Sequence, residues 1–289
     1  MKKLAVLLIM LAPLASAQQT VTSFKSTEVS PGMYMLDGED GFGGGNVTLL
    51  VGDEYVVLID DAMAPTIAAL MDAAGKIAGR PVDFVINTHS HGDHVGGNEH
   101  MASQGAIIVA HDNVHKRMLA EPTLNTGPGA LPVVTFSDAV TFHINGYEAF
   151  VFHIEHAHTD GDAAILFRDA NVIAAGDLMF HKLFPFIDLD NGGSVAGYIA
   201  GQRKILALAD DETRIIPGHG SIASKGDLYA DLKVLIDSQD RVKTLLDEGM
   251  STEEIVAANP LAVYHDDYNW GFITTERMTR TLIRSLTTD

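Results

Sequence analysis

The sequence predicts a layered protein of mixed helical and strand structure. Short apolar runs rich in β-branched residues, which are typical of buried strands, recur along the chain. Stretches of helical character lie between or after these runs, and a sheet with apolar faces takes such helices as covering layers. The 289 residues are enough for one large domain of α/β or α+β class.

The expected elements follow one another along the whole chain. Strands are expected at residues 47–51, 55–59, 82–86, 106–110, 139–144, 149–154, 163–167, 172–175 and 214–216. Helices are expected at residues 65–78, 112–120, 194–209, 226–247, 252–258 and 275–285. No Ser/Gly linker, low-complexity tract or repeat divides the sequence. We therefore expect residues 18–289 to form a single domain.

Residues 1–17 have the composition of a signal peptide. A positive start at Lys2 and Lys3 precedes an apolar run over residues 4–14, and Ala-Ser-Ala at residues 15–17 offers the small side chains that signal peptidase accepts. The run is shorter than the ~20 apolar residues of a membrane helix. We expect cleavage after residue 17 and a periplasmic or secreted protein without membrane insertion.

Charge and composition exclude several classes of function. The chain carries 38 acidic and 19 basic side chains, a formal net charge of −19, which repels phosphate backbones. Nucleic acid is therefore not an expected partner. The absence of Cys excludes disulfides and thiolate metal ligands. The 13 His direct attention to metal binding or proton transfer.

The densest group of candidate metal ligands follows the expected strand at residues 82–86. Here His89, His91, Asp93 and His94 lie close together in a glycine-rich stretch. Alternate side chains of extended backbone point to the same side, so His89 and His91 can face one point. The neighbouring glycines permit a tight turn that brings Asp93 and His94 inward. Imidazole and carboxylate side chains at this spacing predict a metal site.

Three further candidate ligands also follow apolar runs. They are His158 in the segment His-Ala-His-Thr-Asp, Asp177 directly after Gly176, and His219 in Pro-Gly-His-Gly. The ends of strands from separate parts of a sheet can meet at one edge, where open sheets place their sites. Five His and two Asp are enough ligands for two metal ions. Zn²⁺ is the leading choice, with Fe or Mn as alternatives.

In these motifs the sequence resembles the metallo-β-lactamase superfamily, which includes β-lactamases, glyoxalase II type thioesterases and lactonases. The block Thr-His-x-His-x-Asp-His-x-Gly-Gly, the later His-Thr-x-x-Asp, the Gly-Asp and the Pro-Gly-His-Gly occur in the family's order. The resemblance implies a four-layer αββα sandwich of α+β class. It also implies one metal ion held by His89, His91 and His158, a second held by Asp93, His94 and His219, and Asp177 as the bridge between them.

The resemblance and the ligand chemistry together imply a dinuclear zinc hydrolase. Metal coordination lowers the pKa of bound water to about 7, so metal-bound hydroxide can attack an amide or ester carbonyl without a protein nucleophile. The expected catalytic residues are Asp93, which orients the attacking water, and Asp177, which holds the ions at their spacing. The expected partner is a small molecule with a carbonyl centre.

The substrate class remains open. The Cys-containing β-lactamases carry Cys where this chain has Asp177, and Asp at this position together with His94 is closer to the glyoxalase II type ligand set. Export, a compact domain and the lack of a basic tail favour a β-lactam hydrolase instead. That activity is the leading candidate, with a thioesterase or lactonase as the alternative. A one-iron redox enzyme and a non-catalytic metal-binding or sensor protein are alternatives from other classes.

Three residues are candidate substrate contacts. Phe42 lies in the Gly-rich segment 40–46, which forms either a flap over the substrate or a plain hairpin turn. Lys182 is a candidate, with His181 as the alternative, to replace a Lys that some β-lactamases carry at the position of Phe180. Asn191 is either a polar substrate contact or a turn and helix-start residue.

Other residues are candidates for supporting roles. Asp60 and Asp61 close a strand and are candidates to orient a ligand such as His89 or His158 by hydrogen bonding, with a simple turn role as the alternative. The aromatic cluster at residues 264–272 is expected to pack under the C-terminal helices, with a substrate wall as the alternative.

Overall fold

The computed structural model describes residues 21, 23–124, 127 and 129–288. The expected signal peptide and its cleavage site lie outside these residues. None of the helices in the described ranges combines the length and the apolar character that a bilayer span requires.

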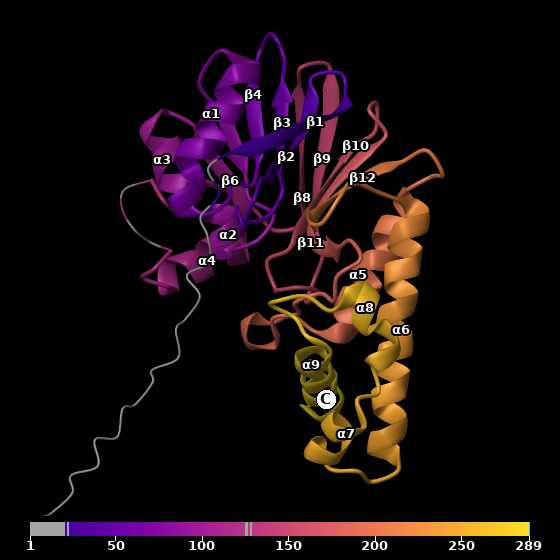
Figure 1. Cartoon of the computed structure of the whole chain (residues 1–289). Helices are drawn as coiled ribbons and strands as arrows, with labels where there is room; N and C mark the ends of the chain where they lie inside the picture. Colours follow the sequence, from indigo (N-terminus) through magenta and orange to yellow (C-terminus); the bar gives the residue numbers. More distant parts are fainter. Residues whose placement is uncertain (1–20, 22, 125–126, 128, 289) are drawn as a thin grey trace, which may run out of the picture.

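The first of two sheets has seven strands in the order of the chain (Figure 1). They are β1 (Phe24–Ser30), β2 (Met33–Gly38), β3 (Val47–Val51), β4 (Val56–Ile59), β5 (Phe84–Ile86), β6 (Ile107–His111) and β7 (Val134–Phe136). Strands β1 to β4 pair antiparallel, and β4 to β7 pair parallel. The carboxyl ends of β4, β5 and β6 therefore point to the same edge of the sheet.

The second sheet has six strands in the order β13-β12-β11-β10-β9-β8. They are β8 (Ala139–Ile144), β9 (Tyr147–His153), β10 (Ala163–Phe167), β11 (Val172–Phe180), β12 (Arg214–His219) and β13 (Ala223–Ser224). Strands β11 and β12 pair in parallel, and the other neighbours pair antiparallel. The carboxyl ends of β11 and β12 thus lie side by side.

The two sheets pack face to face and bury an apolar core between them. Leu50 and Ile86 of the first sheet belong to one cluster with Val151, Ile165 and Ala174 of the second. Helices cover the outer faces as well, so strands such as β3 and β10 are buried on both sides. This double burial explains why they are nearly continuous apolar runs in the sequence rather than alternating ones.

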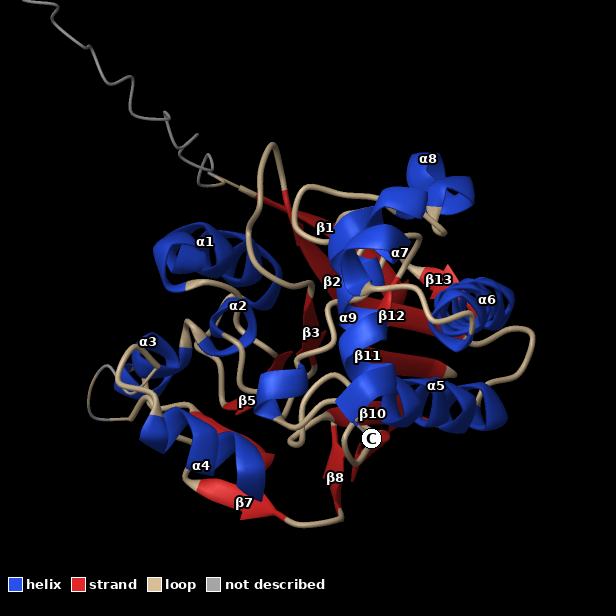
Figure 2. Cartoon of the chain, turned by 90° about the horizontal axis from the view of Figure 1, so that it is seen from below, coloured by secondary structure: helices blue, strands red, loops and turns tan. Residues whose placement is uncertain are grey.

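Helices form the two outer layers (Figure 2). On the first sheet, α1 (Ile67–Ala78) packs through Leu70 and α3 (Asn98–Ser103) through Met101. On the second sheet, α5 (Val195–Leu208) packs through Ile205 and α6 (Lys225–Asp247) through Leu228. A further helix, α4 (Asp112–Ala120), lies against β6 and β7. The result is the four-layer αββα sandwich that the sequence predicted.

The C-terminal helices form a lobe beyond the second sheet (Figure 1). It contains the far part of α6 with α7 (Thr252–Ala258), η3 (Ala262–Tyr264), α8 (His265–Tyr268) and α9 (Thr275–Thr288). Its core joins Leu235, Ile255 and Leu282 to Phe184, which lies in the connection between β11 and α5. The lobe is thereby attached to the chain segment that follows β11.

The sequence pattern missed four strands for identifiable reasons. Strand β1 is at the edge of its sheet and exposes polar side chains, β2 contains no β-branched residue, and β7 and β13 are very short. Two expected strands are longer than predicted, since β11 continues through Asp177 and β12 through His219. The chain path at Gly176 is irregular, with a φ of 51° that favours glycine.

Candidate metal centre

Seven side chains meet at one end of the sheet sandwich. They belong to the turn after β5 (His89 and His91), to α2, which spans Gly92–Val95 (Asp93 and His94), to the connection between β9 and β10 (His158), to β11 (Asp177) and to the end of β12 (His219). The sequence predicted convergence at the edge of one sheet, whereas these residues come from both sheets. Face-to-face packing brings the two sheet edges together.

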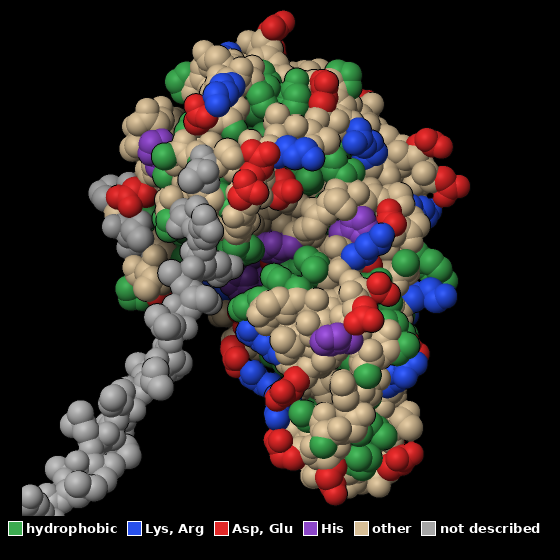
Figure 3. Space-filling view, viewed as in Figure 1, with side chains coloured by type: hydrophobic (Ala, Val, Ile, Leu, Met, Phe, Trp, Pro, Cys, Tyr) green, Lys and Arg blue, Asp and Glu red, His purple; other side chains and the backbone are tan. Residues whose placement is uncertain are grey.

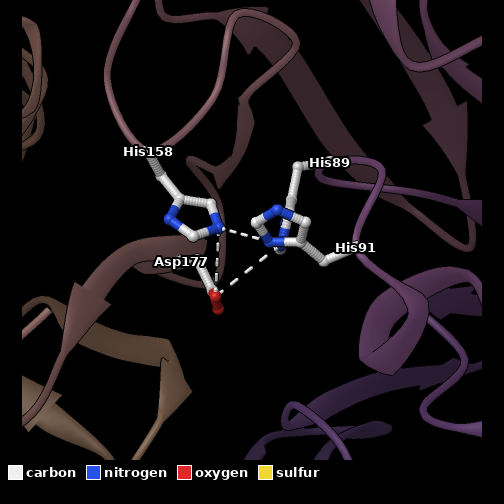
Figure 4. Close-up of side chains that lie close together, drawn as sticks. All are labelled: His89, His91, His158 and Asp177. Carbon is white, nitrogen blue, oxygen red and sulfur yellow. Dashed lines mark hydrogen bonds and ion pairs between the residues drawn. The ribbon is translucent and has the colours of Figure 1, made fainter. Parts of the chain in front are cut away.

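The first group of ligand atoms belongs to His89, His91, His158 and Asp177 (Figure 4). His158 Nε2 lies 2.8 Å from His91 Nδ1 and 3.3 Å from Asp177 Oδ2. His89 Nε2 lies 3.7 Å from the same oxygen. Four ligands bound to Zn²⁺ at about 2.0–2.1 Å in a tetrahedron lie about 3.3 Å from one another. The spacing of this group therefore fits one four-coordinate ion.

The second group consists of Asp93, His94 and His219. Asp93 Oδ2 lies 3.4 Å from His219 Nε2 and 3.7 Å from His94 Nε2. Asp177 adds its Oδ1 atom, 3.1 Å from His94 Nε2 and 3.5 Å from His219 Nε2. Asp177 thus turns Oδ2 to the first group and Oδ1 to the second, which is the position of a bridging ligand.

The buried polar atoms of these groups fit metal ions. His89 Nε2, His94 Nε2 and Asp177 Oδ1 are buried and have no hydrogen-bond partner among the described residues. A single buried polar atom without a partner costs about 1–3 kcal/mol. The three atoms face one space, with His94 Nε2 3.1 Å from Asp177 Oδ1, and a cation bound there would give all three a partner.

The outer ring nitrogens of the histidines support the same conclusion. His94 Nδ1 lies 2.8 Å from Asp60 Oδ2, His158 Nδ1 lies 2.7 Å from the Phe186 carbonyl oxygen, and His91 Nε2 lies 2.9 Å from Asp188 Oδ2. Because these acceptors need N–H donors, the other nitrogen of each ring, which faces the site, is the one available to bind a metal ion. The site-facing nitrogens His158 Nε2 and His91 Nδ1 lie 2.8 Å apart, close enough for both to bind one cation.

Asp60 and Asp61 have different partners. Thr88 Oγ1 donates to Asp60 Oδ2 and lies 3.0 Å from His89 Nδ1, so Asp60 orients His94 directly and His89 through Thr88. Asp61 instead accepts a hydrogen bond from the Gly97 backbone N–H. The expected contact between these aspartates and His158 is not present; the Phe186 carbonyl oxygen takes that place.

The two groups differ in proton affinity. Burial lowers the pKa of His219, but the carboxylates of Asp177 and Asp93 outweigh burial and raise that pKa to about 9. The same balance raises the pKa of His94 well above its usual range. In contrast, burial lowers the pKa of His158 to about 4. Without metal, His94 and His219 therefore carry protons at neutral pH, whereas His158 does not.

Two glycines leave room for the ligands. A Cβ atom at Gly218 would lie 2.0 Å from Asp177 Oδ1, and one at Gly45 would lie 2.1 Å from His94 Cε1. A side chain at either position would displace a ligand from the site. The site thus depends on close approach of backbone as well as on ligand identity.

The two groups open into a pocket of about 1370 Å³ (Figure 3). Met63, Ile67 and Leu124 line it from the side of the first sheet. Aromatic rings line it elsewhere: Phe42, Phe180, Phe186, Trp270 and Phe272. Among the described residues that line the pocket, none is Lys or Arg. The pocket is therefore largely apolar outside the metal centre.

The three candidate substrate contacts have different positions. Phe42 lines the pocket and stacks on His219, with ring centroids 5.7 Å apart. Lys182 is exposed and is not among the lining residues, because the chain turns there at a φ of 56°. Asn191 also lies outside the lining, since its side chain bonds Asp188 and Arg117. Neither Lys182 nor Asn191 lines the pocket in this structure, and a substrate contact from either stays a prediction.

Sequence reasoning missed Asp188 and underestimated the aromatic segment near the C-terminus. Nothing in the local sequence distinguishes Asp188 from other acidic loop residues, and its contact with His91 joins positions far apart in the chain. The segment at residues 264–272 was expected mainly to pack under the C-terminal helices. Trp270 and Phe272 also line the pocket, so the alternative of a substrate wall fits the structure better.

Comparison with known families agrees with this geometry. The model of the metallo-beta-lactamase superfamily matches residues 40–219, which is more than half of the sequence. The chain belongs to the metallo-beta-lactamase superfamily. The predictions of this family, of its fold and of a metallo-hydrolase are thereby confirmed.

Individual relatives are more distant. The chain is 26% identical over 220 residues to a hydroxyacylglutathione hydrolase of Methylococcus capsulatus, with 73% of this chain and 77% of the relative covered. It is 29% identical over 178 residues to the hydroxyacylglutathione hydrolase of Brucella anthropi, with 58% and 61% covered.

Solved structures share the fold at low sequence identity. A metallo-beta-lactamase from Pontibacter korlensis has a TM-score of 0.62 and 19% identity, with 74% of this chain and all of that chain covered. A double mutant of the sec-alkyl sulfatase PisA1 has a TM-score of 0.71 and 18% identity, with 91% and 50% covered.

Proposed function

We propose that this protein hydrolyses the acyl bond of a small ester, thioester or lactone with the help of two metal ions, Zn²⁺ being the leading choice. The observation that carries the proposal is the pair of adjacent ligand groups that share Asp177 beside a large pocket. Two bound ions would activate a water molecule and polarise the substrate carbonyl.

The two aspartates of the centre have separate roles in this proposal. Asp177 is 4% exposed and lies between the groups, so it holds the two sites at a fixed spacing. The Asp93 side chain is 22% exposed and lines the pocket. Burial raises the pKa of Asp93, but His94 and His219 outweigh burial and lower it to about 2. An ionised Asp93 can therefore accept a hydrogen bond from the attacking water and orient it.

From the sequence alone, a β-lactam was the leading candidate substrate. Two observations favour an ester, thioester or lactone instead. The bridging position holds Asp177 rather than Cys, and the curated relatives described above are named hydroxyacylglutathione hydrolases. We retain β-lactam hydrolysis as the second candidate, because the fold is shared with metallo-beta-lactamases.

The test combines metal content with turnover. Purified, metal-replete protein is analysed for metal and assayed on an aryl ester, a thioester, a lactone and a chromogenic β-lactam. We expect two metal ions per chain and hydrolysis of at least one of the first three substrates. One iron per chain with oxygen uptake, or two zinc ions with no acyl hydrolysis, would contradict the proposal, and turnover of the β-lactam alone would support the second candidate.

Variants connect the activity to the site. His91→Ala and Asp93→Ala should each lower kcat/KM by at least about 100-fold, while circular dichroism shows a folded protein. His156→Ala is the matched control, because His156 is close in sequence to the ligand His158 but is exposed and bonds the Gly192 carbonyl oxygen. Retained activity in His91→Ala would contradict the assignment.

A further inference from the structure

We propose that Phe186, Trp270 and Phe272 bind an apolar acyl group, so that the enzyme prefers esters of medium-chain or aromatic acids to charged thioesters. We call these three residues the acyl wall. The inference rests on the proposed hydrolase function and specifies its substrate class.

The acyl wall begins at the metal ligands of both groups. The Phe186 ring centroid lies 5.5 Å from that of His91 and 5.7 Å from that of His158. The Trp270 ring lies 6.1 Å from the ring of His219. A substrate with its carbonyl between the two groups would therefore place its acyl substituent next to these rings.

The acyl wall extends outward to an exposed ring. Phe272 lies 5.3 Å from Phe186 and 5.6 Å from Trp270, measured between ring centroids, and is 46% exposed. The wall thus offers continuous aromatic surface from the ligands to Phe272. Covering an exposed ring of this kind with an apolar ligand removes both surfaces from water.

Backbone contacts hold the acyl wall in place. Trp270 Nε1 donates to the Phe184 carbonyl oxygen at 2.9 Å, so the polar atom of the indole is already satisfied. The Phe184 backbone N–H donates to the Tyr268 carbonyl oxygen, also at 2.9 Å. Arg277 stacks on Phe272 at 4.1 Å and donates to its carbonyl oxygen. The C-terminal segment is thereby attached to the segment after β11 and presents apolar ring surface to the pocket.

The charges of the pocket disfavour a charged thioester. Its described lining contains Asp93, Glu99 and Asp177 but neither Lys nor Arg. The whole chain has a formal net charge of −19, which adds long-range repulsion of anions. The dicarboxylate part of a glutathione thioester would therefore find neither Lys nor Arg in this lining, and Arg277 beside it is already stacked on Phe186 and Phe272 and bonded to the Phe272 carbonyl oxygen. An alkyl or aryl group would find apolar contacts.

The first test measures chain-length preference. The metal-replete protein is assayed on 4-nitrophenyl acetate, butyrate and octanoate and on S-octanoyl glutathione. We expect kcat/KM to rise by about tenfold or more from acetate to octanoate, and the glutathione thioester to be turned over less efficiently than the octanoate ester. Phe272→Ala should remove most of this rise from acetate to octanoate.

The second test reads binding without turnover. Trp270 is the single Trp of the chain, so tryptophan fluorescence reports the acyl wall directly. Titration with octanoate should change the fluorescence in a saturable way and acetate should not, and Phe272→Ala should weaken octanoate binding by about tenfold. Tyr229→Ala is the matched control, since Tyr229 is a 56% exposed aromatic residue of α6 outside the pocket lining.

The outcomes separate the two proposals. Metal-dependent hydrolysis of the acetate ester without a chain-length preference, or octanoate binding that Phe272→Ala leaves unchanged, would overturn the acyl wall alone. Failure to hydrolyse any ester, thioester or lactone would overturn the proposed function and the acyl wall with it.

Discussion

His91 Nε2 lies 2.9 Å from Asp188 Oδ2, which joins a ligand of the first group to a residue 97 positions further along the chain. Asp188 accepts a further hydrogen bond from Asn191 Nδ2 at 2.6 Å, and Asn191 Oδ1 accepts one from Arg117 of α4. Burial raises the pKa of Asp188, but the bonds from His91 and Asn191 outweigh burial and hold it below its usual range. An ionised Asp188 therefore orients His91 with its lone pair toward the site.

We predict that Asp188→Ala weakens metal binding by about 10–100-fold, because His91 loses the acceptor that orients it. The measurement is competition with a chromophoric chelator, together with the absorption spectrum of the Co²⁺-loaded protein. Asp190→Ala is the control, since Asp190 belongs to the same turn but pairs with Arg284. Equal metal affinity in Asp188→Ala and the unsubstituted protein would refute this role.

Metal binding should release protons and strengthen as the pH rises. His219, with a pKa of about 9, and His94, with a pKa well above its usual range, carry protons at pH 7 that a metal ion must displace. Between pH 6 and 8 the apparent affinity should rise by about tenfold per pH unit for each displaced proton. Calorimetry in buffers of different ionisation enthalpy counts these protons, and a count of zero for both sites would contradict the prediction.

Asp231 should make the folded protein less stable at neutral than at mildly acidic pH. Burial raises the pKa of this carboxyl to about 6, above the ordinary value of 3.8. The stabilising contribution of the protonated carboxyl is present below pH 4 and is lost as the pH rises through 6. The Asn side chain of Asp231→Asn can still accept the hydrogen bond from Tyr268 Oη but carries no charge.

In the unsubstituted chain, ionisation of Asp231 should lower the free energy of unfolding by on the order of 1–3 kcal/mol between pH 4.5 and 7.5. Asp231→Asn should lack this contribution. Urea unfolding at the two pH values measures the difference. Asp240→Asn, which changes an exposed carboxylate of the same helix, is the control. Identical pH dependence in the two variants would show that Asp231 does not make this contribution.

The export prediction is tested separately. We propose that residues 1–17 are removed on secretion, because they combine a positive start, an apolar run and a small-residue site. The intact mass of protein recovered from the periplasm or medium should correspond to a chain that begins at Gln18. A mass that includes residues 1–17 would contradict cleavage at this site.

Strands were easy to predict where helices and the second sheet cover both faces. Strand β10 is buried along its whole length, and β3 is buried except at its last residue, so both are apolar runs in the sequence. Strand β1 lies at a sheet edge, and its side chains are partly polar. Edge strands pair through backbone atoms, which leave little trace in a pattern of side chains.

The candidate site divides in a similar way. His89, His91, Asp93 and His94 are close in sequence, so their spacing alone indicated a site. His158, Asp177 and His219 were candidates because each follows an apolar run, and the family resemblance assigned all seven residues to two ions; the structure brings the seven together. The contact from Asp188 and the acyl wall have no comparable sequence signal, since each depends on segments that meet only after the sheets and the C-terminal lobe pack.

The sequence by itself determined the family, the layered fold and the set of candidate ligands, because residue type and short-range spacing carry that information. Only the tertiary structure decided that Asp177 turns one oxygen to each group, that Asp188 contacts His91, and that Trp270 and Phe272 line the pocket. These relationships depend on the positions of two packed sheets and a C-terminal lobe, and burial of their shared apolar surfaces fixes those positions over distances that local patterns do not record.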